Sequence, residues 1–247
     1  TGYVGLVSGT CFADIGNEVI CVDKDKNKIE KLNSGVSPIY EPGLDELIKK
    51  NYIAKRLSFT SDIKQALNLS DIIFICVVTP TKKGSTKVDL SYVLKCTKEI
   101  FKYTKRKKII VTKSTVPIGT GDEIEKILKK KKKLFTVISN PEFLREGEAI
   151  RDFRFPDRIV IGSNEKNSFS IMRKLYAPLI NKGSKFFTTT RRGAELIKYA
   201  SNAFLATKIT FINELANLCE KSGVNIEDIS LGIGSDSRIG GRFLRAG

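Results

Sequence analysis

The sequence Thr1-Gly2-Tyr3-Val4-Gly5-Leu6 has the spacing of the last two glycines in a G-x-G-x-x-G motif. We expect a helix from Leu6 to Ile15, a stop at Gly16-Asn17, and a strand over Val19–Val22 that leads to Asp23. Glycines at such a helix start let the backbone approach a pyrophosphate, and an acid about 20 residues further on can bind a ribose hydroxyl. Two glycines alone would also suit a plain helix start. Together with the strand and the acid, they indicate a dinucleotide-binding βαβ unit.

The acid at position 23 also bears on which dinucleotide would bind. Asp23 would repel a 2′-phosphate, so NAD is favoured over NADP. Lys24 and Lys28 follow closely and weaken that preference. Lys28 is itself a candidate cofactor contact.

The composition limits the classes of protein to consider. With 247 residues and 41% hydrophobic content, the chain can form one large or two modest globular domains. No run approaches the roughly 20 apolar residues of a membrane span, so we expect no membrane partner. The absence of histidine excludes histidine-based triads and histidine metal ligands, and we expect no metal site. The cysteines are scattered without a C-x-x-C pair, which favours a reducing, cytoplasmic location; they are Cys11, Cys21, Cys76, Cys96 and Cys219.

The net charge of +16 raises nucleic acid as a partner. The densest basic runs, Lys102–Lys108 and Lys129–Lys133, each lead into an apolar strand. They are typical of helix ends, where cations suit the helix dipole. No aromatic RNA-binding pattern, zinc spacing or helix-turn-helix signature accompanies them, so we expect no specific nucleic-acid partner. A steep salt-dependent affinity for generic DNA would support that alternative, whereas a basic surface can also steer an anionic nucleotide substrate.

Predicted strands and helices alternate along most of the chain. After the first strand, further strands are expected at Leu57–Thr60, Ile72–Val78, Lys108–Lys113, Phe135–Ile138, Arg158–Ile161 and Phe186–Thr189. Helices are expected at Asp25–Asn33, Gly43–Asn51, Asp62–Leu67, Leu90–Tyr103, Thr120–Lys130 and Ser168–Leu179. This order predicts the α/β class, with a Rossmann-like, doubly wound parallel sheet.

The alternation stops near Thr190. From Arg192 to Cys219 the sequence predicts one long helix, and the glycine-rich, basic segment Gly232–Gly247 is expected to be a loop or the start of another element. We therefore predict a nucleotide-binding domain over residues 1–190 and the beginning of an all-α, dimerising domain over residues 191–247.

Three polar clusters follow predicted strands directly. They are Val77–Thr81, Lys113–Pro117 and Ser139–Gly147. Each alone would be a proline-containing turn or a helix cap in most proteins. Ligands of doubly wound sheets bind beyond the carboxyl ends of the strands, so three such clusters favour one shared site.

The third cluster carries a family resemblance. Asn140-Pro141-Glu142-Phe143-Leu144-Arg145-Glu146-Gly147, followed by Pro156–Gly162, resembles the UDP-glucose/GDP-mannose dehydrogenases. Further matching segments occur in the family's order over essentially the whole chain: Gly2–Gly5, Tyr40–Leu44, Lys113–Pro117 and Ala194–Phe204. The form of the third cluster is most similar to the members that convert UDP-glucose to UDP-glucuronate. GDP-mannose and UDP-N-acetyl-mannosamine remain the rival substrates.

The resemblance implies a four-electron oxidation of an alcohol to an acid by two NAD molecules in turn, through a cysteine thioester. By the same resemblance, Glu142 would be the general base for the water step, and Thr115 would help to position that water. Lys198 and Asn202 would stabilise a developing oxyanion, and their spacing of four residues puts both on one helix face. Without the resemblance, Lys198 and Asn202 would be an ordinary solvated pair.

The resemblance also implies a set of binding residues. The cofactor contacts would be Gly2, Tyr3, Val4, Gly5, Asp23, Lys28, Thr79, Pro80, Thr81, Ser114, Thr115 and Glu146. The substrate contacts would be Glu142, Phe143, Leu144, Arg145, Glu146, Lys198, Asn202, Arg238, Arg245, Ala246 and Gly247.

The sequence departs from the family pattern at both ends. The first strand, the first motif glycine and the G-G-S-C-F-x-K-D segment with the nucleophilic cysteine lie outside these residues, so we expect a fragment that is incomplete for catalysis. The complete protein is expected to be a homodimer or a higher oligomer. A catalytically inactive nucleotide-binding remnant is the alternative of a different class.

Overall fold

The structure is a computed structural model that describes residues 1–247, apart from the side chain of Lys132. The first elements form a two-stranded parallel sheet with its helices. They are, in order, α1 (Tyr3–Asp14), β1 (Val19–Val22), α2 (Lys26–Asn33), α3 (Leu44–Ile53) and β2 (Leu57–Thr60). Asp62 caps the next helix, because its side chain accepts two backbone N–H groups at the start of α4 (Ile63–Leu69).

A second sheet has five strands in the order β3-β4-β5-β6-β7. The strands are β3 (Ile72–Ile75), β4 (Lys108–Thr112), β5 (Phe135–Ser139), β6 (Arg158–Ser163) and β7 (Lys185–Thr189). The predicted α/β class is confirmed, and all pairs but one are parallel. β6 runs antiparallel to β5, so the prediction of a wholly parallel sheet is wrong at this pair. The connection over residues 140–157 contains only the short helix α7 (Ala149–Arg154), and the chain returns without the crossover that parallel neighbours need.

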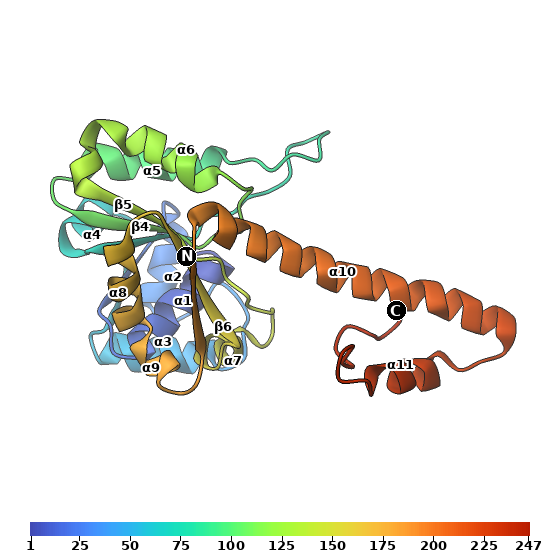
Figure 1. The fold of residues 1–247 in the computed structure, drawn as a ribbon. Coiled ribbons are helices and arrows are strands. Elements are labelled where there is room, and N and C mark those ends of the chain that lie inside the picture. The colour runs from blue at the N-terminus through green and yellow to red at the C-terminus, as the bar shows by residue number, and fades with distance from the viewer. The chain divides into compact units, whose positions relative to one another are not determined.

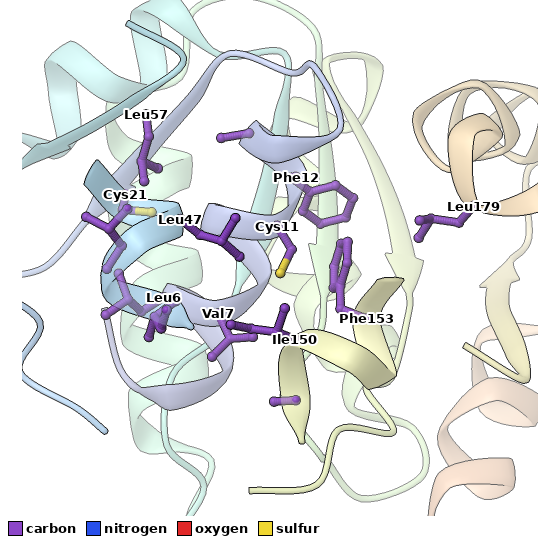
Figure 2. Packing of buried hydrophobic residues seen from close by; sticks show 14 of the residues in the cluster. Leu6, Val7, Cys11, Phe12, Cys21, Leu47, Leu57, Ile150, Phe153 and Leu179 are labelled. Atoms are coloured by element: carbon purple, nitrogen blue, oxygen red, sulfur yellow. The ribbon is translucent and has the colours of Figure 1, made fainter. Parts of the chain in front are cut away.

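Helices cover both faces of the five-stranded sheet (Figure 1). They are α5 (Ser91–Tyr103), α6 (Thr120–Leu128) with a 3-10 turn over Lys129–Leu134, α8 (Lys166–Leu175) and α9 (Ala177–Ile180). Neighbouring strand residues alternate between two cores: Val111 and Ile138 pack with α1 and α7, and Ile110 and Val137 pack with α5 and α6. Figure 2 shows the first core around Phe12. Burial on both faces explains why these strands are continuous apolar runs.

The basic runs lie at helix ends, as predicted. The ammonium of Lys131 donates to the carbonyls of Phe101 and Thr104 at the end of α5, at 2.9 and 3.2 Å. Lys108 donates to the carbonyl of Ser70, just beyond α4. Part of the positive charge therefore satisfies carbonyls that a helix end leaves without partners.

The chain divides into two compact units, Thr1–Leu196 and Ile197–Gly247. The long helix α10 (Arg191–Ser222) begins in the first unit and continues into the second. The second unit adds α11 (Ile226–Gly234), which was not predicted and which overlaps the first residues of the segment Gly232–Gly247, expected to be a loop or the start of another element. Asn225 caps this helix by accepting the N–H of Glu227 at 2.8 Å. The predicted boundary at residue 190 stays a prediction.

Two other elements differ from their predicted form. The helix expected over Ser168–Leu179 is divided at Tyr176 into α8 and α9. The short helix α7 was not predicted. Across the described residues, no helix has both the length and the apolar character to cross a bilayer.

Candidate nucleotide and catalytic site

The start of α1 provides free backbone donors. Gly2 is the extended residue before the helix, and its carbonyl accepts the N–H of Leu6 at 2.8 Å, so α1 begins at Tyr3, one turn before the predicted start. Among the described side chains, none caps this first turn. A Cβ added at Gly5 would lie 3.1 Å from the Cβ of Cys76, so the glycine allows the helix to pack closely against the segment after β3. The first turn can therefore hydrogen-bond an anionic group.

Asp23 lies directly after β1, as predicted. Its carboxylate accepts the hydroxyl of Thr1 at 2.7 Å and the backbone N–H of Asp25 at 3.0 Å. Burial opposes ionisation, but these hydrogen bonds outweigh it and hold the pKa of Asp23 well below its usual range. Lys28 lies in the first turn of α2, where its backbone N–H is accepted by Asp25 at 3.2 Å. An ionised carboxylate therefore stands at the end of β1.

The loops after β3 and β4 are joined to each other. The hydroxyl of Thr79 donates to the carbonyl of Thr115 at 2.8 Å, and the hydroxyl of Ser114 donates to the carbonyl of Val77 at 2.6 Å. Since β3, β4 and β5 are parallel neighbours, all three polar clusters begin at one edge of the sheet, as predicted. Pro80 and Thr81 lie in the same loop, and Thr81 forms an isolated bridge with Val88.

The loop after β5 is held by Asn140, to which the sequence assigned no role of its own. Its side chain is buried, donates to the carbonyl of Val160 at 2.9 Å and accepts the hydroxyl of Tyr176 at 2.6 Å. Two residues later, the carboxylate of Glu142 accepts the backbone N–H of Leu144 at 2.6 Å. The predicted base therefore lies two residues after a buried side chain that is fixed by two hydrogen bonds.

Two predicted substrate contacts have partners within this chain. The guanidinium of Arg145 is bound by Asp152 at 2.6 and 3.0 Å and by Glu148 at 2.6 Å. The guanidinium carbon of Arg158 lies 4.0 Å from the centroid of the Phe143 ring. The substrate contacts of Phe143, Leu144 and Arg145 stay predictions.

Glu41 belongs to this site, although the sequence assigned it no role. It is buried, and its carboxylate accepts the N–H groups of Gly147 at 2.9 Å and Ala149 at 2.8 Å. The same carboxylate accepts the hydroxyl of Tyr3, and burial together with this hydrogen bond raises the pKa of Tyr3. Glu146, a predicted cofactor contact, is exposed next to this point. In the sequence, Glu41 was noted only as part of the segment Tyr40–Leu44, which resembles the family but suggested no chemical role for this residue.

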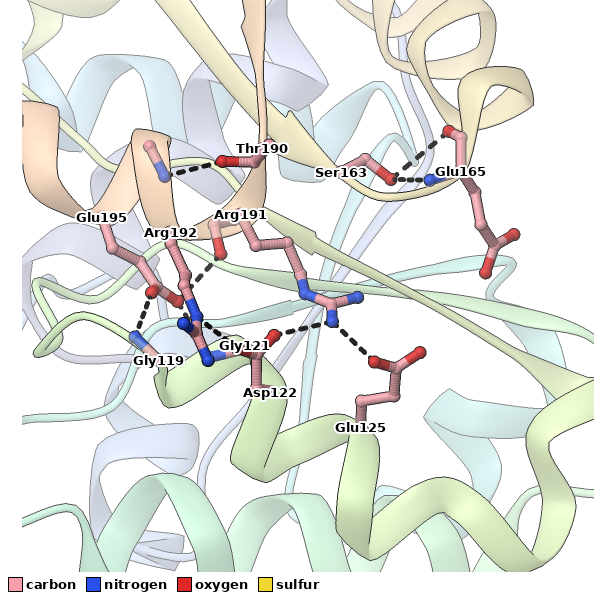
Figure 3. A network of polar contacts seen from close by, with 12 residues as sticks. Gly119, Gly121, Asp122, Glu125, Ser163, Glu165, Thr190, Arg191, Arg192 and Glu195 are labelled. Atoms are coloured by element: carbon pink, nitrogen blue, oxygen red, sulfur yellow. Dashed lines mark hydrogen bonds and ion pairs between the residues drawn. The ribbon is translucent and has the colours of Figure 1, made fainter.

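Glu195 is a second anchor that the sequence did not identify (Figure 3). Its carboxylate is buried and accepts the N–H groups of Gly119 at 2.6 Å and Gly121 at 2.8 Å, together with the hydroxyl of Ser139 at 3.1 Å. Burial raises the pKa of Glu195 above its ordinary value, against the effect of these hydrogen bonds. The first turns of α10 are thereby fixed to the start of α6 and to the end of β5.

The remaining predicted residues belong to the second unit. Lys198 is buried and Asn202 is exposed, both on α10. The guanidinium of Arg238 is paired with Asp236 at 2.6 Å. Gly247, the last of the predicted contacts Arg245–Gly247, donates its N–H to a side chain of α10 at 3.2 Å. The roles of these residues in a shared site stay predictions.

Four of the five cysteines are poor nucleophiles. Burial raises the pKa of Cys11, Cys21 and Cys96 to about 12 and that of Cys76 to about 11. Cys219 is also buried. A thiol with such a pKa is almost entirely protonated at neutral pH, and the thiolate is the reactive form.

Comparison with known proteins agrees with these features. Residues 1–180 match the NAD binding domain of the UDP-glucose/GDP-mannose dehydrogenase family, and residues 192–247 match its central domain. The chain is 54% identical to a UDP-glucose 6-dehydrogenase of Rhizobium meliloti and 51% identical to the UDP-glucose 6-dehydrogenase TuaD of Bacillus subtilis. Both matches cover 100% of this chain, and they cover 57% and 53% of the two relatives.

Solved structures show the same similarity. A UDP-glucose dehydrogenase from Pyrobaculum islandicum superposes with a TM-score of 0.94 at 37% identity, over 100% of this chain and 57% of the other. A GDP-mannose dehydrogenase from Pseudomonas aeruginosa superposes with a TM-score of 0.90 at 37% identity, over 95% and 55%. The chain thus spans little more than half the length of these relatives. With a free helix start, an acid at the end of β1 and both domain matches in order, the chain belongs to the UDP-glucose/GDP-mannose dehydrogenase family.

Proposed function

We propose that this chain contains the cofactor-binding part of an NAD-dependent dehydrogenase that oxidises UDP-glucose to UDP-glucuronate. The observation that carries the proposal is the identity of 54% to a UDP-glucose 6-dehydrogenase over the entire chain. The solved structures do not separate the substrates, because UDP-glucose and GDP-mannose dehydrogenases both match at 37% identity. The preference for UDP-glucose therefore rests on the sequence relatives.

The residues of the first unit fit the proposed cofactor. The uncapped N–H groups at the start of α1 suit a pyrophosphate, and the ionised Asp23 suits the two hydroxyls of an NAD ribose. Lys28 lies beside that acid on α2. We assign the nicotinamide side of the site to the joined loops after β3 and β4 and to Glu146. NAD, when bound, would supply the hydride acceptor.

The proposed reaction releases four electrons as two hydrides. One alcohol, two NAD⁺ and one water give one carboxylate, two NADH and three protons. Glu142 would accept a proton from the attacking water, and Thr115 would hold that water. Lys198 and Asn202 would stabilise the negative oxygen that forms in each step. The nucleophilic thiol of the family reaction is not assigned to any of the five cysteines here, because four have raised pKa values and Cys219 is buried.

The second unit supports a further part of the proposal, a homodimer. On α10, three large apolar residues spaced by seven are exposed: Phe204 by 66%, Phe211 by 52% and Leu218 by 57%. Residues seven apart lie on the same helix face, so these side chains form one apolar stripe. We propose that a second copy of the protein covers this stripe, in the cytoplasm. Sedimentation of the complete gene product should show a dimer or a larger assembly, and a strictly monomeric species would contradict the assignment.

The activity test uses the complete gene product that contains these residues, because the relatives are nearly twice as long. Purified enzyme is mixed with NAD and, separately, UDP-glucose, GDP-mannose or UDP-N-acetyl-mannosamine, and NADH is followed by absorbance. We expect two NADH for each UDP-glucose consumed. Turnover of another nucleotide sugar alone would replace the substrate assignment. A protein that neither binds NAD nor forms NADH would be the inactive remnant.

A further inference from the structure

The carboxylate of Glu41 joins two parts of the site that are far apart in the sequence. Its Oε1 accepts the N–H of Ala149 at 2.8 Å, and its Oε2 accepts both the N–H of Gly147 at 2.9 Å and the hydroxyl of Tyr3. Glu41 itself is only 5% exposed. We propose that Glu41 is a positioning residue. It would couple dinucleotide binding at the first turn of α1 to the position of the loop that carries Glu142 and Glu146. This inference rests on the proposed function.

The first part of the coupling is the helix start. Tyr3 lies in the first turn of α1, between the two motif glycines, where the free N–H groups would bind a pyrophosphate. Its hydroxyl is bonded to Glu41, so any change of that turn on ligand binding is transmitted to the carboxylate. Any residue at position 3 could offer its backbone N–H to a pyrophosphate. Only the hydroxyl of tyrosine can also bond to Glu41.

The second part is the loop after β5. Gly147 has a φ of +85°, a left-handed conformation that glycine adopts without strain, and it follows Glu146 directly. The conformation directs its N–H to Glu41 and allows Ala149, at the start of α7, to bind the other oxygen. Both ends of the connection between Glu146 and α7 are therefore held by one carboxylate.

The far end of α1 is tied to the same short helix. Asp14 binds Lys50 of α3 and Arg154 of α7, each at 2.7 Å. Together with Glu41, these bonds join α7 to both ends of α1. The loop that carries the proposed base is consequently bonded to the helix that would bind the cofactor. We therefore expect a ligand at the first turn of α1 to order this loop as well.

Glutamine cannot replace the carboxylate. Glu41→Gln leaves one acceptor oxygen for two backbone N–H groups on opposite sides, so either orientation of the amide points an N–H at an N–H. Tyr3→Phe is the gentler change, because it removes only the hydroxyl and keeps both backbone bonds of Glu41. It tests the coupling even if Glu41→Gln fails to fold. The matched controls are Tyr52→Phe and Glu46→Gln, on exposed side chains of α3.

The experiment measures amide hydrogen exchange of residues 143–149 in the complete gene product, with and without saturating NAD. In the unaltered protein and both controls, we expect NAD to slow exchange about tenfold. In Tyr3→Phe, we expect the affinity for NAD to fall several-fold. At saturating NAD, we expect hydrogen exchange of the loop in this variant to be the same as without NAD.

The outcomes separate this inference from the proposed function. Equal NAD-dependent protection in Tyr3→Phe and in the unaltered protein would overturn the coupling and leave NAD binding in place. A purely structural role of the hydroxyl would lower the melting temperature of the ligand-free protein and keep the protection, and that result would also overturn it. Failure of the unaltered protein to bind NAD would reject the proposed function and the inference with it.

Discussion

The hydroxyl of Ser139 donates to Oε1 of Glu195 over 3.1 Å, and this bond joins the last residue of β5 to the first turns of α10. The same carboxylate accepts two backbone N–H groups at the start of α6 (Figure 3). A negative group at a helix start is also favoured by the helix dipole. Glu195 thus ties the first turns of α10 to the end of β5, which precedes Glu142, and to the start of α6.

Replacing Glu195 by glutamine should destabilise the protein. The amide retains one acceptor oxygen, so either the half-buried N–H of Gly119 or the buried N–H of Gly121 loses its partner. An unsatisfied buried donor costs about 1–3 kcal/mol of the free energy of unfolding. Urea unfolding followed by circular dichroism measures this loss. Glu214→Gln, an exposed change on the same helix, is the control, and equal midpoints for the two variants would contradict the role of Glu195.

Gly162 permits the close approach of α10 to β6. A Cβ at this position would lie 2.6 Å from the Cβ of Ala194 and 2.6 Å from the carbonyl oxygen of Thr190. Because the second contact is with a backbone atom, Gly162→Ala should shift the start of α10. It should lower the free energy of unfolding by about 1–3 kcal/mol. Gly232→Ala is the matched control, since a Cβ there meets nothing within 4 Å and alanine favours helix. Thermal unfolding should show a lower melting temperature for the first variant only.

Acid should weaken the contact between α1 and α7. Burial opposes ionisation of Asp14, but hydrogen bonds from Lys50 and Arg154 lower its pKa from 3.8 to about 2. A carboxyl group with a lowered pKa stabilises the folded state above its unfolded pKa, and this stabilisation is lost as the pH falls from 3.8 toward 2. Asp14→Asn should lower the free energy of unfolding by about 1–2 kcal/mol at neutral pH. It should also flatten the dependence of that free energy on pH in this window. An unchanged profile relative to Glu30→Gln would count against the ion pairs.

The charge at position 23 should select the cofactor. Asp23→Ser keeps an acceptor for the N–H of Asp25 and removes the negative charge that opposes a 2′-phosphate. We expect weaker NAD binding and a rise of about tenfold in the ratio of NADP to NAD affinity, equivalent to about 1.4 kcal/mol. Titration with each dinucleotide measures the ratio, with Asp45→Asn as the control. No change in the ratio would place the ribose elsewhere.

Loss of the proposed base should affect the chemical step alone. In the complete gene product, Glu142→Gln keeps an acceptor for the N–H of Leu144 but cannot accept a proton from water. We expect kcat to fall about 10²–10⁴-fold with NAD affinity unchanged, because general base catalysis contributes that much. Steady-state kinetics and NAD titration measure the two quantities. An activity equal to that of Glu123→Gln would remove Glu142 from the reaction.

Local sequence patterns predicted most of the first unit. The strand Val19–Val22 and the helix starts at Asp25 and Asp62 were recognisable, because periodicity and capping depend only on neighbouring residues. The direction of β6 was not recognisable from the sequence, because an apolar run has the same composition whether its strand pairs parallel or antiparallel to its neighbour. The helix α7 has only six residues, too few for a periodic signal.

By itself, the sequence determined the α/β class, the three polar clusters at strand ends and the family resemblance, since these follow from residue types within short segments. Only the tertiary structure showed that Glu41 and Glu195 hold the site together. Their partners include Ala149, 108 positions from Glu41, and Gly119, 76 positions from Glu195, and no local pattern contains such pairs. A buried carboxylate acquires its role from the donors that folding brings to it, so that role appears only when the chain is folded.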